Sequence, residues 1–334
     1  MIFLRISSLL LLTGIGSASA TELAIKEAQF MLNGKTIFLY GISYYGGLGA
    51  SEEFVGRDLD DMQRYRFNWI RVWATWSAFN TNLSAVNPDD GQPREPFFDR
   101  LKSLITECDR RGMVVDVTIG KGDGLGRERL DNLEKHRRVV TALVTSLKAY
   151  RNWYLDLSNE RDVRDKRFTS FEDLKQLRDD VKRIDPARLV TASSGSDISR
   201  DELRDYLQKA QVDFITPHRP RDPNSPKHTE EITRQLLAWM KEFGRVVPVH
   251  YQEPFRRGYT DWQPKAEDFV ADVVGAKIGG AAGWCFHNGS QRKAPDAKPL
   301  RSFDLREKRL FDQLDAEERK AIEELRARLK LSAD

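Results

Sequence analysis

The chain alternates between short, mostly apolar runs and longer stretches in which apolar residues recur at helical spacing. Residues 67–73 and 153–157 are two of the short runs, and residues 97–111 form one of the amphipathic stretches. Short apolar runs that do not alternate strictly with polar residues are typical of parallel strands covered by helices on both faces. The pattern therefore predicts an α/β protein built from strand–helix units.

Eight such units can be counted along the chain. We expect strands at residues 37–44, 67–73, 113–119, 153–157, 189–192, 214–216, 247–251 and 281–286. We expect helices at residues 54–65, 97–111, 132–150, 170–184, 200–210, 230–243, 265–278 and 316–330. No Gly-x-Gly-x-x-Gly turn opens any of these helices, which argues against an open sheet that binds a dinucleotide. We predict a single-domain (β/α)8 TIM barrel, with two short strands around the Asn33-Gly34 turn sealing its floor.

The first twenty residues have the three parts of a secretory signal peptide. Arg5 precedes an apolar stretch at residues 6–15, and Ala18-Ser19-Ala20 supplies the small residues that precede a cleavage site. The apolar stretch is short for a membrane span, and no second long uncharged run follows. We expect residues 1–20 to be removed and residues 21–334 to form the barrel domain. The mature protein is expected to be secreted or periplasmic, without stable membrane insertion.

Charge and cysteine content narrow the function classes further. The formal net charge of +3 arises from 54 Lys and Arg against 51 Asp and Glu, and the two signs are interleaved along the predicted helices. This balance argues against nucleic acid as a partner. We expect Cys108 and Cys285 to be buried small apolar residues rather than a disulfide. The glycine-rich residues 120–126 lack the Lys-Ser/Thr ending of a phosphate-binding loop, so we interpret them as a flexible loop.

Two glutamates close predicted strands. Glu160 ends the run 153–160, and Glu253 ends the run 246–253. The carboxyl ends of TIM-barrel strands meet at one face of the barrel, where the active sites of this fold lie. We therefore expect both carboxylates to face one pocket. Such a pair is what glycoside hydrolysis requires, because one carboxyl donates a proton while the other attacks the sugar or activates water.

These residues and their neighbours resemble a known family. Asn159-Glu160 after the fourth strand, Glu253 after the seventh, Trp284 after the eighth and the Asn33-Gly34-Lys35 hairpin are similar to glycoside hydrolase clan A, particularly the cellulase-like family five. The resemblance covers essentially the whole mature chain in architecture. It implies a TIM barrel that cleaves β-glycosidic bonds in a poly- or oligosaccharide with retention of configuration, without a cofactor.

The resemblance also implies roles for individual residues. Glu160 would be the general acid/base, Glu253 the nucleophile, and Asn159 would hold the sugar hydroxyl next to the reacting carbon. Arg71, at the end of the second strand, resembles the family's arginine beside the nucleophile, where its positive charge would keep Glu253 ionised. Direct attack requires the two carboxyls to be separated by about 5–5.5 Å.

Aromatic residues near strand ends are a second signature of a sugar site. The C–H faces of sugar rings pack on indole and phenol rings. Trp284 is the predicted platform under the sugar that is cleaved, and Tyr44, Tyr45, Trp73 and Trp76 are expected to form further walls.

The sequence departs from the family pattern at two places. The third strand has Asp116-Val117-Thr118 where the family often has Asp-x-His, and His218-Arg219-Pro220 lacks the tyrosine of the family's His-x-Tyr. Tyr251 and Tyr259 are the candidates to replace this tyrosine. The differences indicate an atypical subgroup, and they leave the identity of the substrate open.

Three histidines lie near predicted strand ends. We expect His218 to be a site residue, and His287, after the eighth strand, to reach the pocket. His250 alternates with Glu253 along its strand, so we expect a core position that faces the helices.

Six basic residues fall in the loops predicted after strands six to eight: Arg219, Arg221, Arg256, Arg257, Arg292 and Lys293. One interpretation is a site for an acidic glycan, because guanidinium groups bind carboxylates and sulfates in paired hydrogen bonds. The other is solvated loop charge balanced by Asp222 and Asp261, which we favour.

Two functions of other classes stay open. One is a metal-dependent barrel hydrolase or deacetylase that uses His218, His250 or His287 with Asp116, although no His-x-His pair occurs in the sequence. The other is a catalytically silent carbohydrate-binding barrel, which the missing histidine and tyrosine leave open. Our prediction is a monomer that acts on a carbohydrate and holds neither metal nor cofactor.

Overall fold

The computed structural model describes residues 20–79, 81–121, 130–164, 168–289 and 300–330. Most of the predicted signal peptide, most of the glycine-rich loop, and both Arg292 and Lys293 lie outside these residues. Within the described part of the chain, no helix combines the length and the apolar character that crossing a membrane requires.

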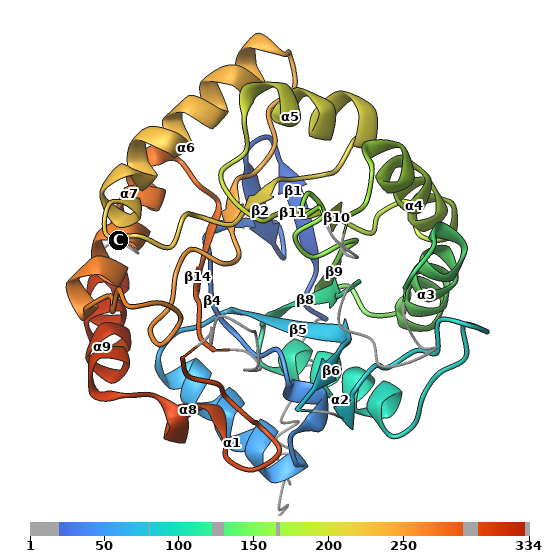
Figure 1. Cartoon of the computed structure of the whole chain (residues 1–334), viewed down its shortest axis with the longest axis horizontal. Coiled ribbons are helices and arrows are strands. Elements are labelled where there is room, and N and C mark those ends of the chain that lie inside the picture. The colour runs from blue at the N-terminus through green and yellow to red at the C-terminus, as the bar shows by residue number, and fades with distance from the viewer. Residues whose placement is uncertain (1–19, 80, 122–129, 165–167, 290–299, 331–334) are drawn as a thin grey trace, which may run out of the picture.

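Parallel strands form a closed barrel at the centre of the molecule (Figure 1). The strands are β4 (Leu39–Ser43), β5 (Trp69–Thr75), β8 (Val114–Ile119), β9 (Trp153–Asp156), β10 (Val190–Thr191), β11 (Ser193–Ser194), β12 (Thr216–Pro217), β13 (His250–Tyr251) and β14 (Gly283–Phe286). Seven of them pair in the order β10-β9-β8-β5-β4-β14-β13. The ring closes because β11 pairs with β12 and a parallel bridge joins Ile215 to Val249. The predicted TIM barrel is confirmed, with its fifth strand divided into β10 and β11.

Helices surround the barrel and follow the strands in alternation (Figure 1). They are α1 (Glu52–Arg64), α2 (Phe97–Arg110), α3 (Leu133–Leu147), α4 (Phe171–Ile184), α5 (Arg200–Asp205) with η2 (Tyr206–Ala210), α6 (Ser225–Glu242), α7 (Ala266–Gly279) and α9 (Ala316–Lys330). Shorter turns form η1 (Gly47–Gly49) and α8 (Leu310–Gln313). Four helices begin at a side-chain cap, Ser51, Asn132, Ser170 or Ser199, whose oxygen accepts a backbone N–H three residues on.

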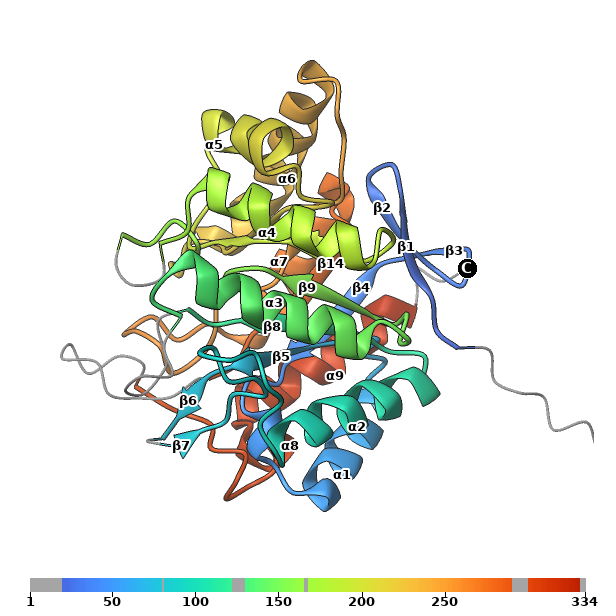
Figure 2. The ribbon, with the colours of Figure 1, turned by 90° about the vertical axis from the view of Figure 1, so that its right-hand side faces the viewer.

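A small antiparallel sheet closes the amino-terminal end of the barrel. It consists of β1 (Leu23–Lys26), β2 (Gln29–Leu32) and β3 (Lys35–Ile37). Asn33 and Gly34 both have positive φ, as the tight turn between β2 and β3 requires. Phe30 of β2 packs edge-on against Phe214 inside the barrel, with ring centroids 5.0 Å apart. The predicted floor is confirmed, and Figure 2 shows it opposite the hairpin of β6 (Ser77–Ala78) and β7 (Thr81–Asn82).

Alternation along the strands decides which side chains fill the barrel. His250 is fully buried and packs edge-on against Trp69, with ring centroids 4.6 Å apart. A Cβ atom on Gly283 would lie 2.2 Å from the His250 ring, so β14 needs glycine there. The predicted core position of His250 is confirmed, but its predicted direction is wrong, because it points into the barrel and not toward the helices. The regular alternation ends after Gln252, so Gln252 and Glu253 both turn inward.

Both cysteines are buried and unbridged, as expected. Cys108 lies in α2 and Cys285 in β14. The Cys285 thiol faces the barrel interior, where its sulfur lies 3.4 Å from the Ser43 hydroxyl. Burial raises the pKa of both thiols above their ordinary value, so neither is a reactive thiolate.

Candidate active site

Glu160 and Glu253 lie together at the carboxyl ends of the strands. Glu160 follows β9 and Glu253 follows β13. One carboxylate oxygen of each and one ring nitrogen of His218 all lie within 4.8 Å of one another. The Glu253 side chain is buried, whereas 14% of the Glu160 side chain is exposed. The two carboxylates therefore share one site although their environments differ.

Arg71 of β5 lies inside the barrel and bonds to side chains from neighbouring strands as well as to Glu253. Its Nη1 lies 2.5 Å from Oε1 of Glu253, and its Nη2 donates to Oδ2 of Asp156 at 2.9 Å. Its Nε donates to the Thr118 hydroxyl at 2.9 Å, and that hydroxyl donates to Asp116. Thr118 stands where the family pattern has histidine, and it orients the arginine through one hydrogen bond.

The segment that carries Asn159 and Glu160 is held in an unusual conformation. Nη2 of Arg71 donates to Oδ1 of Asn159 at 2.9 Å, which fixes the orientation of that amide. Glu160 has φ 47°, a left-handed conformation that costs a non-glycine residue on the order of 1 kcal/mol. Its backbone N–H donates to the Ser193 hydroxyl at 3.0 Å. The surrounding contacts thus aim the Glu160 carboxylate toward Glu253.

Two histidines face the glutamates from neighbouring strands. Nδ1 of His218 lies 3.4 Å from Oε1 of Glu160 and 3.7 Å from Oε2 of Glu253. Nε2 of His287 lies 3.4 Å from Oε2 of Glu253, and its Nδ1 lies 2.8 Å from the Tyr45 hydroxyl. Burial lowers the pKa of His287 well below its ordinary value, so this ring is neutral near pH 7. The structure brings His218, His287 and Tyr45 to the site that the sequence predicts for them.

A second arginine, Arg221, lies beside both glutamates. Its Nη2 donates to Oε2 of Glu253 at 2.9 Å and lies 3.7 Å from Oε1 of Glu160. Only 19% of its side chain is exposed. Arg221 contacts Glu253 from the loop where the family pattern has a tyrosine, whereas the hydroxyl of Tyr251 contacts Thr233 of α6.

The favoured interpretation of the loop arginines as solvated charge is wrong for the four that the structure describes. Arg219 pairs with Asp197, and Arg257 pairs with Asp315 at 2.8 Å. Arg256 is buried and donates to the Asn288 carbonyl at 3.1 Å. The sequence shows their charge but not the fold of the loops, which turns these side chains inward.

The charges around the two glutamates decide their protonation. Burial raises the pKa of Glu253, but His218, His287, Arg71 and Arg221 together hold it well below its ordinary range. Burial and the Glu253 charge raise the pKa of Glu160, but the His218 hydrogen bond and the Arg221 charge outweigh them. The pKa of Glu160 is therefore below its ordinary value. Both carboxylates are therefore ionised at neutral pH in this structure. Beneath them, burial raises the pKa of Asp116 to about 8.

Three aromatic residues predicted for the site lie elsewhere. Trp284 is fully buried, and its Nε1 donates to Oδ2 of Asp272 in α7 at 2.6 Å. The Tyr44 hydroxyl donates to Asp58 of α1 at 3.1 Å. Tyr251 contacts α6, as described above. These predictions are wrong because Ser43, His250 and Gly283 face inward, so the next residue on each strand faces the helices.

The remaining predicted aromatic walls cluster where the strands end. Tyr45, Trp73 and Trp76 pack against one another, with ring centroids 5.2 Å apart for Tyr45 and Trp73 and 5.5 Å apart for Trp73 and Trp76. Trp73 keeps 8% of its surface exposed, and the Arg71 guanidinium lies 5.9 Å from the Tyr45 ring centroid. Tyr45 thus joins this aromatic cluster to the charged site.

Sequence reasoning missed Asp156, Gln252 and the role of Thr118. Gln252 donates to Asp116 at 2.5 Å, and Asp156 pairs with Arg71. A signal for these residues exists in the sequence: each is polar and occupies an inward position near the end of a largely apolar strand. Such positions are costly unless the polar group is paired.

Glu160, His218 and Glu253 also have the donor types of a metal site. Their ligand atoms are close enough to share one ion. However, Arg71 and Arg221 already place two guanidinium groups on Glu253. A divalent cation would lie beside both positive charges, so the residues present do not fit a metal well. His250, one of the predicted ligands, lies away from these glutamates, deep in the barrel.

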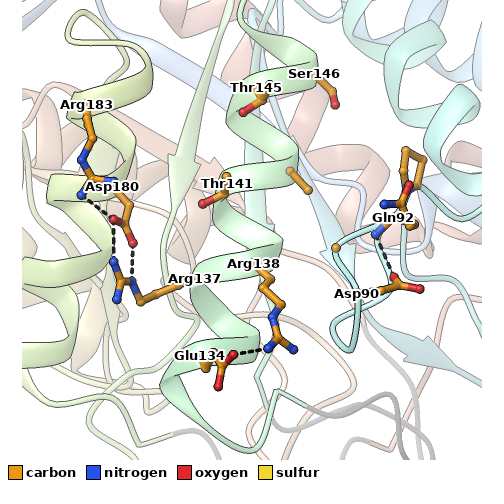
Figure 3. A pocket seen from close by; sticks show the side chains of 13 residues that line it. Asp90, Gln92, Glu134, Arg137, Arg138, Thr141, Thr145, Ser146, Asp180 and Arg183 are labelled. Atoms are coloured by element: carbon orange, nitrogen blue, oxygen red, sulfur yellow. Dashed lines mark hydrogen bonds and ion pairs between the residues drawn. The ribbon is translucent and has the colours of Figure 1, made fainter.

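A separate hollow of about 630 Å³ lies on the outer surface, between α3, α4 and the loop at residues 90–93 (Figure 3). Its charged side chains pair among themselves: Arg137 with Asp180, and Arg138 with Glu134. None of the residues around Glu160 and Glu253 lines it. The charges of these four residues are therefore paired within the hollow, and they give no sign of a separate binding site.

Solved structures that resemble this fold include glycoside hydrolases. A structure described as a glycoside hydrolase has a TM-score of 0.70 at 14% identity, and the match covers 94% of this chain and 75% of that chain. An endo-1,4-β-mannanase from Rhizomucor miehei has a TM-score of 0.65 at 12% identity, over 93% and 100%. A glycoside hydrolase family 5 mannosidase from Rhizomucor miehei has a TM-score of 0.59 at 14% identity, over 95% and 99%.

The chain therefore has the TIM-barrel fold of family 5 glycoside hydrolases, and the predicted resemblance is confirmed at the level of the fold. The sequence itself matches no protein-family model, and no curated protein matches it significantly.

Proposed function

We propose that the protein is a retaining β-glycoside hydrolase in which Glu160 is the general acid/base and Glu253 the nucleophile. The observation that carries the proposal is the approach of the two carboxylates within 4.8 Å, on the fourth and seventh strand positions of the barrel. This distance suits direct attack, because inverting enzymes keep their carboxyls about 6.5–9.5 Å apart to admit a water.

In the first step, Glu160 gives its proton to the glycosidic oxygen as the bond to the anomeric carbon breaks. A Glu253 oxygen attacks that carbon from the opposite face and forms a covalent glycosyl ester. Arg71 supports this role because its charge keeps Glu253 ionised.

In the second step, the Glu160 carboxylate takes a proton from water. The resulting hydroxide oxygen bonds to the anomeric carbon, and the Glu253 carboxylate leaves. The amide of Asn159, which Arg71 orients, is placed to hold the neighbouring sugar hydroxyl. Glu160 ends this step protonated and ready for the next cycle. Because its carboxyl is ionised in the free site, the first step requires its pKa to rise when substrate binds.

The proposal is tested with the Glu253→Ala variant on aryl β-glycosides of the gluco, galacto and manno series. We expect hydrolysis to be abolished, and azide to restore part of the turnover by forming the α-glycosyl azide, identified by NMR. Glu230→Ala, on the surface of α6, is the matched control. Unchanged activity in Glu253→Ala would remove Glu253 from the mechanism, and an initial α-configured product from the native protein would show inversion.

A catalytically silent sugar-binding barrel is the second candidate, because Arg221 bridges the two glutamates as the structure stands. The two functions separate on the same panel. Sugar binding without turnover of any glycoside or polysaccharide would favour the silent barrel.

We further propose that the protein is exported, because residues 1–20 have the pattern of a signal peptide. Expression of the full chain with its own leader, followed by amino-terminal sequencing of the exported protein, should give Thr21 as the first residue. Retention of Met1 in a membrane fraction would instead indicate an uncleaved anchor.

A further inference from the structure

Two arginines meet on one tyrosine beside the glutamates. The Arg221 guanidinium carbon lies 4.3 Å from the Tyr259 ring centroid, and that of Arg256 lies 4.6 Å from the same centroid. Arg256 is 5% exposed and is held by the Asn288 carbonyl. Both guanidinium groups are thus fixed next to the site by the loops that follow β12 and β13.

Gathering two positive charges at a buried position costs free energy. Burial, followed by the Arg221 charge, lowers the pKa of Arg256 to about 10. Carboxylates offset this cost for Arg221, because Glu253 and Glu160 lie 2.9 and 3.7 Å from its Nη2. An anionic group on a bound molecule would lower this cost further, since guanidinium groups bind carboxylate and sulfate through two parallel hydrogen bonds.

The position of Arg221 also conflicts with the proposed hydrolysis. Its Nη2 bridges Oε1 of Glu160 and Oε2 of Glu253, where the bond to be cleaved must lie. A neutral sugar would have to break this ion pair without replacing it, leaving a buried charge uncompensated. A sugar that carries its own anion exchanges one ion pair for another.

We propose that Arg221, Arg256 and Tyr259 form a binding site for a carboxylate or sulfate carried by the substrate sugar, and that this anion draws Arg221 away from Glu160 and Glu253. The inference rests on the proposed function and names its substrate class as an acidic glycan. Moving Arg221 opens the space between the glutamates. It also removes one of the charges that lower the pKa of Glu160, leaving that carboxyl facing His218 and Glu253.

The test compares matched aryl β-glycosides in the gluco, galacto and manno series: the neutral sugar, its uronic acid and its 6-sulfate. We expect native kcat/KM to favour a charged member at least tenfold in the series turned over best, and the uronate and sulfate arms show which anion fits. Neutral members cleaved as well as the charged ones would overturn the proposal.

Three variants separate the roles of the two arginines. Arg256→Gln should lower kcat/KM for the preferred charged member at least tenfold more than kcat/KM for the neutral member. Arg221→Gln should also lower kcat/KM for the charged member, but it should raise kcat/KM for the neutral member. The alkaline limb of the pH profile for the neutral member should move to higher pH. Arg234→Gln, an exposed arginine of α6, is the control for loss of one positive charge. Equal losses on charged and neutral members in Arg256→Gln would contradict the anion site.

Titration calorimetry measures sugar binding directly, so this test does not depend on turnover or on the folding of a single variant. The methyl β-glycosides of the same panel are titrated into the native protein and into Arg256→Lys, which keeps the charge and loses the paired hydrogen bonds. Tighter binding of a charged member by the native protein, weakened at least fivefold in Arg256→Lys, supports the site even if no glycoside is hydrolysed. Equal binding of charged and neutral members overturns it.

Discussion

Nη1 of Arg71 and Oε1 of Glu253 lie 2.5 Å apart, and neither side chain is appreciably exposed. The arginine reaches Glu253 from β5, across the barrel from β13, and contacts Asp116 and Asp156 on the way. A buried cation held by several carboxylates cannot move without leaving charge unpaired. This pair therefore sets the position of Glu253, whereas Arg221 contacts it from the loop between β12 and α6.

Replacing Arg71 with lysine should keep the charge and lose the geometry. Lysine cannot donate to Thr118, Asp156 and Glu253 in one plane. Loss of two charge-assisted hydrogen bonds, about 3 kcal/mol, should lower kcat by on the order of 100-fold. Arg188→Lys is the control, because Arg188 donates to the carbonyls of Trp153 and Tyr150 away from the site. Similar kcat losses in both variants would show a general folding defect.

Thr118→Val should reveal whether the hydroxyl that replaces the family's histidine orients Arg71. The isosteric change removes the acceptor of Arg71 Nε and the donor to Asp116. We expect the free energy of unfolding to fall by about 1–3 kcal/mol and kcat/KM to fall about tenfold. Thr118→Ser, which keeps the hydroxyl, should retain most of both quantities. Urea unfolding and steady-state kinetics provide the measurements, and equal activity in Val and Ser variants would remove Thr118 from this role.

Substitutions of Trp284 and Trp73 should have different effects, the first on the stability of the fold and the second on sugar binding. Trp284→Phe removes the indole donor to the buried Asp272, so we expect a stability loss of about 1–3 kcal/mol with unchanged KM. Trp73→Ala removes an aromatic wall near the strand ends and should raise KM about tenfold, or about 1.4 kcal/mol. Thermal unfolding and KM measured on both variants test this division. A raised KM in Trp284→Phe would return that indole to the site.

Acid should destabilise the fold through two buried histidines. Burial lowers the pKa of His136 from 6.5 to about 4 and that of His250 to about 3. The unfolded chain therefore binds more protons than the folded chain between these values and pH 6.5. Each histidine contributes stability that is present above pH 6.5 and is lost as the pH falls through its folded pKa, on the order of 3 kcal/mol for His136.

His136→Gln isolates one of these contributions. Glutamine does not titrate and keeps a donor for the Leu157 carbonyl, which Nε2 of His136 contacts at 2.6 Å. The slope of the unfolding free energy against pH between 4 and 6.5 should become shallower, as measured by urea titration. His228→Gln, at an exposed position of α6, should leave the slope unchanged. An unaltered slope in His136→Gln would assign the acid sensitivity elsewhere.

The sequence allowed the barrel to be predicted because each strand is a compact apolar run and each helix has one apolar face. The direction of a side chain could be predicted only where the ends of its strand could also be predicted. Trp284 lies inside β14 rather than after it, so it faces α7, while His287 faces inward. The inward turn of Glu253 next to Gln252 breaks the period of two, which no pattern in the sequence marks. Arg221 depends on loop conformation, which local propensity does not encode.

The sheet of β1, β2 and β3 has a kinetic consequence. Phe30 and the side chains above it fill the barrel from that end, so the described chain offers approach to the glutamates only from the carboxyl ends of the strands. In the proposed hydrolase, a polysaccharide would lie across the site and would not pass through the barrel. The cleaved sugar would leave by the route on which the next chain arrives, so released product should compete directly with substrate.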